Sequence, residues 1–144
     1  SLKIYEYSFT SYYAAMDSMS AYYKHNMELL DKGVRNELFG ERDIYTKVRD
    51  SAPSKYGKHA VVRNSLISDG CEIEGVVENC ILFRGVKVAK GAVVRNSIIM
   101  QDNIIGENTE LDCVITDKNV VISDKKHLSG CPDLPYYIPK GTRL

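Results

Sequence analysis

Cysteine and histidine are the residue types in this chain best able to act as nucleophiles, bases or metal ligands. There are four cysteines and three histidines among 144 residues. No two cysteines form a C-x-x-C pair and we expect a cytoplasmic chain, so neither a disulfide framework nor a zinc site is indicated. No histidine lies close in sequence to Cys71, Cys80 or Cys113. We therefore predict that these thiols are small buried side chains without a catalytic role.

A segment of about seven residues is repeated along the chain, and this repeat determines the fold that positions the cysteines and histidines. Val61–Ile67 (VVRNSLI) is nearly matched by Val93–Ile99 (VVRNSII), with Val76–Leu82 (VVENCIL) between them and a weaker copy at Leu111–Ile115 (LDCVI). Steps of 15, 17 and 16 residues separate the Asn or Asp of each copy, at Asn64, Asn79, Asn96 and Asp112. Regularity of this kind indicates a repeat architecture in which successive units stack.

A finer beat of six residues runs through the copies. Aliphatic residues recur six apart in three series, namely Val61, Ile67 and Ile73; Val76, Leu82, Val88 and Val94; and Ile99, Ile105 and Leu111. A small or β-branched residue follows most of them after four positions. This is the hexapeptide pattern of a parallel β-helix, whose aliphatic side chains point into the coil. With three sides of six residues to a turn, the repeat region holds about four turns.

The corners and flat faces of such a prism make further predictions. Gly70, Gly85 and Gly91 open similar short patterns, and glycine adopts the positive φ of a corner at little cost. Several apolar residues lie beside inward positions, at Leu66, Ile81, Phe83, Ile98 and Met100. We expect some of them to face outward and make subunit contacts, although shifted corners would turn them inward.

Upstream of the repeats, apolar side chains fall on one helical stripe. They recur at steps of three and four residues, at Met19, Tyr22, Tyr23, Met27 and Leu30. These steps predict one amphipathic helix over roughly 18–31. Ser18 or Asp17 can cap its N-terminus, and Gly33 suits its C-terminal end.

The remaining segments connect and cover the β-helix. Residues 36–58 read as a strap, in which Ile44–Val48 alternates like a strand before Pro53 interrupts it. The open ends of a β-helix invite further pairing, and we expect the helix, the strap and the Pro-rich tail to cover them. The chain is thus mainly β, with a helix and linker (1–58), a parallel β-helix (59–125) and a C-terminal tail (126–144).

Composition narrows the possible partners. Lys plus Arg and Asp plus Glu each total 19, so the formal net charge is zero. Nucleic acid is therefore not expected as a partner, because phosphate neutralisation needs a basic surplus. No apolar run is long enough to span a bilayer and no signal peptide opens the chain, so no membrane partner is expected either. The first residue is Ser1, which suggests a fragment of a longer protein.

Two classes of enzyme with hexapeptide repeats are disfavoured by the positions of the histidines. An acyltransferase needs a catalytic histidine that projects from a coil, but His59 precedes the first expected coil and His127 follows the last. A zinc hydratase needs several histidines from adjacent coils, and none lies between these two. A purely structural oligomerisation module remains open, and it predicts subunit contacts without small-molecule binding.

The helix segment resembles a known family. Met19–Leu30 (MSAYYKHNMELL) is similar to the helix that joins the two domains of glucose-1-phosphate adenylyltransferase, also called ADP-glucose pyrophosphorylase. Asn64–Gly75 resembles the first coil of that family, and Gly85–Val88, Gly91–Val93 and Asp117–Asn119 resemble later coils. The resemblance covers about residues 12–122. It implies a left-handed β-helix that serves tetramer assembly and helps to form an allosteric site.

The resemblance also implies what this chain lacks. The family makes ADP-glucose from ATP and glucose 1-phosphate in bacterial glycogen synthesis, using an N-terminal domain with a Gly-rich loop and magnesium. No such loop stands in this sequence. Where catalytic members carry Asp-Val-Gly-Thr, whose Asp helps to hold the metal, this chain has Ala15-Met16-Asp17-Ser18, and alanine offers no oxygen ligand. We therefore expect a non-catalytic second subunit, with no catalytic, metal or cofactor residue here, in an oligomer with a catalytic subunit.

One candidate binding site follows from the same resemblance. In related enzymes the lysine of the Asp117-Lys118-Asn119 turn lines an activator site for phosphorylated sugars or acids. An ammonium group suits a phosphate, so Asp117 and Lys118 are candidate effector-binding residues. A solvated corner lysine is the alternative. After this turn the sequence departs from the family, because Ser123–Lys126 replaces a further coil.

Overall fold

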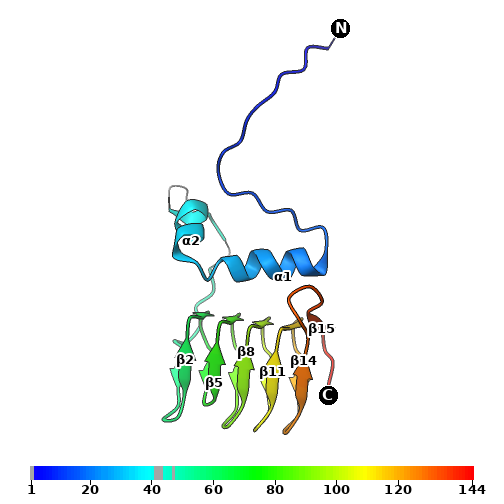
Figure 1. Cartoon of the computed structure of the whole chain (residues 1–144). Coiled ribbons are helices and arrows are strands. Elements are labelled where there is room, and N and C mark those ends of the chain that lie inside the picture. The colour runs from blue at the N-terminus through cyan, green and yellow to red at the C-terminus, as the bar shows by residue number, and fades with distance from the viewer. Residues whose placement is uncertain (1, 41–43, 47) are drawn as a thin grey trace.

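A computed structural model of the chain describes residues 2–40, 44–46 and 48–144. A β-helix extends from Lys55 to the C-terminus, and two helices lie beside it (Figure 1). Residues 2–17 form an extended arm, whose later part lies along α1 and whose N-terminal part runs away from these elements. Within the described chain, neither helix has the length and apolarity needed to cross a membrane.

Short parallel strands form three sheets, which we call A, B and C. Sheet A contains β1 (Lys55–Tyr56), β4 (Glu72–Ile73), β7 (Lys87–Val88), β10 (Ile104–Ile105) and β13 (Val121–Ile122). Sheet B contains β2 (Val61–Arg63), β5 (Val76–Glu78), β8 (Val93–Arg95), β11 (Glu110–Asp112) and β14 (His127–Ser129). Sheet C contains β3 (Leu66–Ile67), β6 (Ile81–Leu82), β9 (Ile98–Ile99), β12 (Val114–Thr116) and β15 (Tyr136–Ile138).

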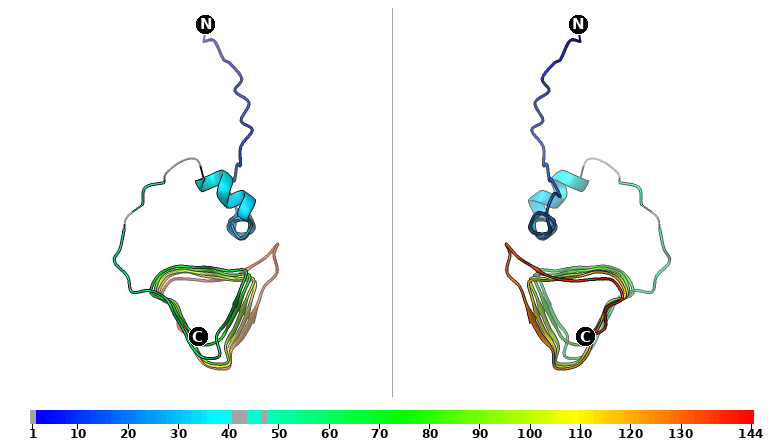
Figure 2. Two further views of the ribbon diagram at one scale, coloured as in Figure 1. Left: turned by 90° about the vertical axis from the view of Figure 1, so that its left-hand side faces the viewer. Right: turned by 90° about the vertical axis from the view of Figure 1, so that its right-hand side faces the viewer.

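The chain visits the sheets in the order A, B, C and then begins the next coil. Seen along its axis, the β-helix is a triangular prism whose coils lie over one another (Figure 2). Five strands stack in each sheet, so four turns separate the first strand from the last, as the repeats predict. In Figure 1 the path rises through sheet B at the front, passes to the back beneath α1, and advances to the right. This winding is left-handed, as the resemblance implies.

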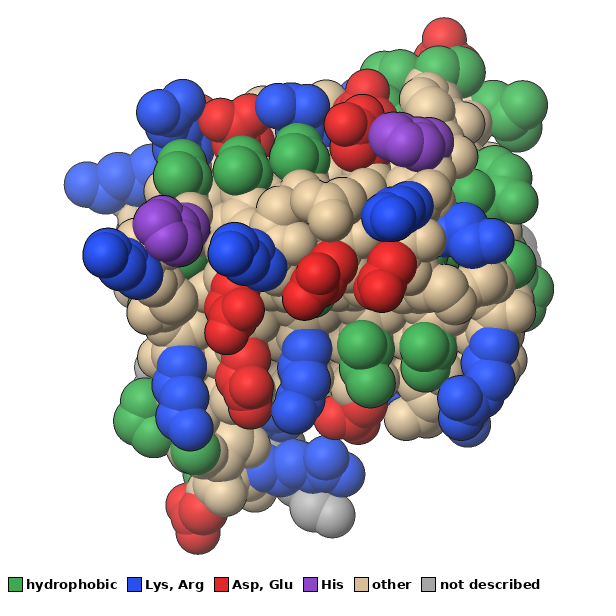
Figure 3. Space-filling view, turned by 90° about the horizontal axis from the view of Figure 1, so that it is seen from below, with side chains coloured by type: hydrophobic (Ala, Val, Ile, Leu, Met, Phe, Trp, Pro, Cys, Tyr) green, Lys and Arg blue, Asp and Glu red, His purple; other side chains and the backbone are tan. Residues whose placement is uncertain are grey.

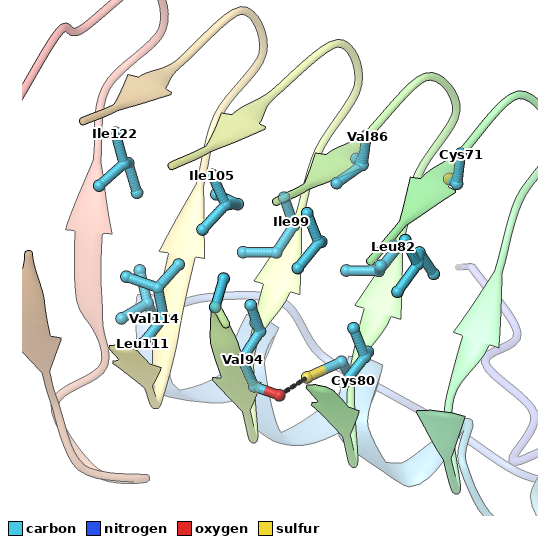
Figure 4. Packing of buried hydrophobic residues seen from close by; sticks show 14 of the residues in the cluster. Cys71, Cys80, Leu82, Val86, Val94, Ile99, Ile105, Leu111, Val114 and Ile122 are labelled. Carbon is cyan, nitrogen blue, oxygen red and sulfur yellow. Dashed lines mark hydrogen bonds between the residues drawn. The ribbon is translucent and has the colours of Figure 1, made fainter. Parts of the chain in front are cut away.

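The six-residue beat fills the interior of the prism (Figure 4). Seven of the predicted inward residues are at most 1% exposed, namely Ile73, Leu82, Val88, Val94, Ile99, Ile105 and Leu111. The prediction is wrong at Val61 and Val76, which face outward, because Val62 and Val77 hold the positions that pair with Val94. Adjacent residues of a strand point to opposite faces, so a one-residue error in phase exchanges inside and outside.

Positive φ angles occur at the corners. Gly70, Gly85 and Gly91 have φ of 74°, 70° and 74°, which confirms the expected role of these glycines. At the corner between sheets B and C the same region is occupied by Asn64, Asn79, Asn96 and Cys113. Asparagine is one of the few residues that tolerate this conformation well. The fourth copy therefore aligns on Cys113, and the sequence alignment on Asp112 is wrong by one residue.

The C-terminal residues belong to the β-helix. β14 pairs with β11 and β15 pairs with β12, and the backbone N–H of Val121 donates to Thr142 O at 2.9 Å. The coils therefore extend beyond both expected limits, 59 and 125. The expectation of a separate tail fails because residues 130–135 form a longer connection that interrupts the six-residue beat, after which pairing resumes.

The upstream segment contains two helices where the sequence predicts one. α1 (Met19–Glu28) begins after Ser18, whose side chain accepts from the N–H of Ala21, as expected. α1 ends at Glu28 with Leu29 as its C-cap, and Asp31 caps a second helix, α2 (Lys32–Phe39), by accepting from the N–H of Val34. Gly33 lies inside α2 and does not end α1, because the Asp31 cap provides the start signal of a new helix.

The strap follows α2. Residues 44–46 and 48 form no strand, so the predicted strand at 44–48 is wrong for these positions, and Lys47 lies outside the described residues. The side chain of Ser54 anchors the end of the strap by donating to Ser68 O at 2.8 Å and accepting from the N–H of Cys71 at 3.2 Å. Ordinary strand pairing with the second coil begins at Lys55.

Candidate functional site

α1 lies along one side of the prism and does not cover an end, contrary to expectation (Figures 1 and 2). It packs on sheet C, where Tyr22, Tyr23 and Met27 contact a cluster that contains Ile98 and Ile115. Ile98 is fully buried, so this outward residue serves an internal contact and is not free for another subunit. Apolar residues on sheet C thus find their cover within the same chain.

Tyr23 is the centre of this contact. Its hydroxyl donates to Asn96 O at 2.6 Å and lies 3.5 Å from Cys113 Sγ. The side chain is 5% exposed. Burial, with the hydrogen bond to Cys113, raises the pKa of Tyr23 well above its usual range, so the phenol stays protonated. Tyr23 therefore connects α1 to two successive coils.

The candidate effector turn lies between β12 and β13, at the corner where sheets C and A meet. Asp117 Oδ1 accepts from the backbone N–H of Lys118 at 2.6 Å, and its Oδ2 accepts from the Tyr137 hydroxyl at 3.3 Å. The Lys118 side chain is exposed. The two candidate residues therefore differ in their availability to a ligand. The Asp117 carboxylate stabilises the turn, while the Lys118 ammonium group faces solvent.

A buried asparagine supports this turn from the coil below. Asn103 is fully buried, and its amide nitrogen donates to Asp117 O and to Met100 O, each at 2.9 Å. Its oxygen accepts from the N–H of Val120. The same side chain also donates to Thr116 Oγ1. Asn103 therefore satisfies backbone hydrogen-bonding groups on both sides of Lys118, at Asp117 and Val120.

Replacement of Asn103 by alanine leaves these backbone groups buried without a partner. We expect Asn103→Ala to lower the free energy of unfolding by about 2 to 3 kcal/mol, the cost of several unsatisfied groups in one place. Urea denaturation measures this loss. Gln101→Ala is the control, because Gln101 Oε1 has no hydrogen-bond partner among the described residues. An equal loss in both variants would contradict this role for Asn103.

Residues from successive coils stack in a row along the same corner, and three of the five are cationic. The carbonyls of Asp69, Arg84, Gln101 and Lys118 accept, in turn, from the N–H groups of Gly85, Asp102, Asn119 and Gly141. This ladder stacks residues 69, 84, 101, 118 and 140, one from each coil. Strands of adjacent coils lie about 4.8 Å apart, so Arg84, Lys118 and Lys140 lie along one corner, with Gln101 between the first two. The sequence singled out Lys118 but not its neighbours, because they are separated from it by whole coils.

The structure describes Ala15 and Asp17, the segment in which we expect no metal ligand. Ala15 has no ligand atom, and Asp17 is exposed just before α1. Across the described ranges 2–40, 44–46 and 48–144, no group of three or more His, Cys, Asp or Glu could hold a metal ion.

The cysteines agree with their prediction as small buried side chains. Cys71, Cys80 and Cys113 are buried, and Cys131 is exposed. Burial raises the pKa of the Cys80 thiol to about 12, and burial also raises the pKa of Cys71 and Cys113. The Cys80 thiol donates to Val94 O at 3.3 Å (Figure 4). Such thiols are poor nucleophiles near neutral pH, since the thiolate is the reactive form.

His59 and His127 lie within the stacked coils and not outside them, contrary to expectation, because β1 begins at Lys55 and β14 contains His127. His59 lines a surface hollow together with Glu74 and Lys90. His59 is exposed at the start of the coils, and His127 is exposed on β14. His127 Nδ1 lies 3.4 Å from Glu110 Oε2 on the surface of sheet B. His25 lies on α1, where Nδ1 is 2.9 Å from Glu28 Oε2. This last pair, with the Tyr12 hydroxyl donating to Glu28 at 2.7 Å, attaches the arm to α1.

Comparison with known proteins agrees with this geometry. Residues 50–130 match the family model described as GlmU-like, C-terminal hexapeptide. The chain belongs to this family. The hexapeptide match covers most of the stacked coils, whose strands and inward aliphatic residues have just been described.

Individual relatives show a more specific similarity than the family model does. The chain is 46% identical to "Glycogen biosynthesis protein GlgD" of Bacillus subtilis (strain 168) over 141 residues. The matched segment covers 97% of this chain and 41% of that protein. The chain is 49% identical over 118 residues to the protein of the same name from Geobacillus stearothermophilus, covering 81% of this chain and 34% of that protein. It is 36% identical over 115 residues to "Glucose-1-phosphate adenylyltransferase" of Acetivibrio thermocellus, covering 78% of this chain and 27% of that protein. The chain thus spans well under half the length of each.

Proposed function

We propose that this chain is the C-terminal part of a non-catalytic subunit that works with glucose-1-phosphate adenylyltransferase in glycogen biosynthesis. The observation that carries the proposal is the 46% identity, over 97% of this chain, to a protein named for glycogen biosynthesis. Ala15 supports the non-catalytic role, because a methyl group stands where catalytic members have a metal-binding carboxylate. The adenylyltransferase relative, at 36% identity, supports the association with that reaction.

Residues 1–58 are proposed to contain the end of a catalytic-type domain. The arm exposes many large apolar side chains, at Leu2, Ile4, Tyr5, Tyr7, Phe9, Tyr13 and Met16. Folded proteins rarely leave so many neighbouring large apolar side chains exposed to water. A preceding domain that packs on the arm and on the far side of α1 would cover these side chains. In this arrangement α1 joins the two domains while Tyr23 fixes it to the coils.

The second part of the proposal assigns effector binding to the Lys118 corner. Arg84, Lys118 and Lys140 form the positive row described above, and phosphorylated sugars or acids are the ligands that such a row suits. Asp117 is proposed to position the turn and not to contact the ligand, because its carboxylate is engaged with Tyr137 and would repel a phosphate. We propose a cytoplasmic location for the complex, in keeping with a role in glycogen synthesis.

The experiment that tests this function is an activity assay with the full-length protein. ADP-glucose formation by a glucose-1-phosphate adenylyltransferase is measured with and without it, while fructose 1,6-bisphosphate and related phosphates are titrated. We expect the protein to be inactive alone and to change the turnover, the substrate affinity or the effector response of its partner. If the two proteins neither associate nor affect each other's kinetics, the regulatory function is wrong.

Substitution of Lys118 separates regulation from assembly alone. We expect Lys118→Ala to raise the effector concentration for half-maximal response about tenfold, the loss of one charge-assisted contact. Lys87→Ala on sheet A is the matched control, because it removes an exposed lysine from a different face. Association with an unchanged effector response in Lys118→Ala would support the purely structural module.

A further inference from the structure

Sheet B presents a flat face that nothing in the described chain covers. The end-on views show the coils lying over one another, so the face has little twist (Figure 2). In each strand of sheet B the first and third residues point outward. The third residues form a row in which the charge alternates, from Arg63 to Glu78, Arg95 and Asp112.

An apolar row lies beside this charged row. The first residues of the same strands are Val61, Val76 and Val93, followed by Glu110 and His127. Figure 3 shows the two rows from below, with blue and red side chains alternating next to a line of hydrophobic ones. Three exposed or half-buried valines next to four alternating charges are an unusual composition for a surface that faces only water.

The charges along the row alternate from positive to negative. A second copy of the row in the opposite order therefore sets an opposite charge against each member. A two-fold axis that runs parallel to the strands, between β5 and β8, places a second copy on the face in the opposite order. Arg63 then lies opposite Asp112 of the second copy, and Glu78 lies opposite its Arg95. The same operation places Val76 opposite Val93. Four ion pairs thus form one row alongside the two contacts between Val76 and Val93, and Val61 lies opposite Glu110 of the second copy. Self-complementary patches of this kind are typical of two-fold interfaces.

The spacing of the strands keeps these pairs in register. Both copies have the same distance of about 4.8 Å between adjacent strands. A match at β5 and β8 is therefore also a match at β2 and β11. This argument needs a sheet with little twist, which the overlapping coils provide.

Pairing within one chain does not account for the whole charged row. Glu78 already lies 3.2 Å from Arg63 and 3.1 Å from Arg95. Asp112 extends the alternation but makes no ion pair with any residue that the structure describes, and its Oδ1 only accepts from the Asn96 amide at 2.8 Å. The Arg63 side chain remains 73% exposed. The Asp112 carboxylate and the Arg63 guanidinium stand at the two ends of the charged row, where reversal brings them together.

The other two faces do not offer the same fit. Sheet C is covered by α1 over Ile98 and Ile115. The outward row of sheet A runs Lys55, Glu72, Lys87, Ile104 and Val121, and no two-fold axis across it pairs all three charges with opposite ones. We infer that sheet B binds a second copy of this chain, with the two prisms antiparallel and related by the axis between β5 and β8.

The oligomeric state of the 144-residue chain tests the inference. Sedimentation equilibrium should show a monomer–dimer equilibrium that weakens as salt is added, because screening reduces the ion pairs. Asp112→Arg should raise the dimer dissociation constant about tenfold or more, since the two-fold axis sets arginine against Arg63 at two places. Asp112→Arg leaves the Arg63–Glu78–Arg95 pairs within the chain intact.

A charge swap distinguishes the proposed pairing from a general effect of charge. Arg63→Asp alone should weaken the dimer, and the double variant Arg63→Asp/Asp112→Arg should regain most of the lost affinity. Lys87→Glu on sheet A is the control and should leave the dimer unchanged, while circular dichroism checks that every variant is folded. A chain that stays monomeric at all attainable concentrations overturns the inference, and so does a dimer that Asp112→Arg does not weaken or that the double variant does not restore.

Discussion

Tyr23→Ala should detach α1 from the β-helix. The substitution removes an almost fully buried aromatic ring and its hydrogen bond to Asn96 O, and truncation of a buried aromatic residue typically costs about 3 to 5 kcal/mol. A free helix of ten residues is too short to be stable in water. We therefore expect the helical circular dichroism signal to fall and the amide protons of α1 to exchange rapidly, while the coils stay protected.

Tyr23→Phe is the matched control for this prediction. It keeps the ring and removes only the hydroxyl, so we expect a loss of about 1 kcal/mol, the usual contribution of one hydrogen bond. Hydrogen exchange followed by mass spectrometry measures α1 and the coils separately in both variants. Protection of α1 in Tyr23→Ala equal to that in the unmodified chain would show that Tyr23 is not what holds the helix.

Ile99→Ala should destabilise the coils themselves. Ile99 is fully buried in the middle coil and pairs with Leu82 on one side and Thr116 on the other. The loss of an isoleucine side chain and the cavity that it leaves should lower the free energy of unfolding by about 3 to 4 kcal/mol. Urea denaturation followed by circular dichroism at strand wavelengths measures this change.

Ile67→Ala makes the same substitution at the end of the stack. Ile67 lies in the same inward row but in the first coil, where it is only partly buried and has one neighbouring coil, through Leu82. A repeat protein is stabilised by contacts between adjacent repeats, so we expect a smaller loss of about 1 to 2 kcal/mol. Equal losses at both positions would mean that the end of the stack is as well packed as its centre.

The fold could be predicted from the sequence because its strongest signals are local. The six-residue beat requires one aliphatic residue per side, and Leu82, Val88, Val94 and Ile99 obey it in the structure. The positive φ of Gly70 and the Ser18 cap likewise follow from the chemistry of single residues. These features need no knowledge of which segments meet in space.

The details of register could not be predicted in the same way. Val61 and Val62 are both valine, so composition cannot decide which one points inward, and only pairing with the next coil does. The fourth copy aligns on Cys113 because its strand pairs with β8 in that register. The last coil was missed because residues 130–135 lengthen one connection, and periodicity cannot be followed across an insertion.

The candidate site shows the same division. The resemblance identified the Asp117-Lys118 turn, but the buried Asn103 beneath it and the cations of Arg84 and Lys140 beside it come from other coils.

The sequence by itself determined a stack of hexapeptide coils preceded by a capped helix, because those patterns depend on neighbours within a few residues. Only the tertiary structure decided that α1 lies on sheet C, where Tyr23 meets Asn96 from 73 residues away. It also decided that the charges of sheet B form one alternating row, because each member comes from a different coil. Contacts of this kind depend on stacking, which brings together residues that no local pattern connects.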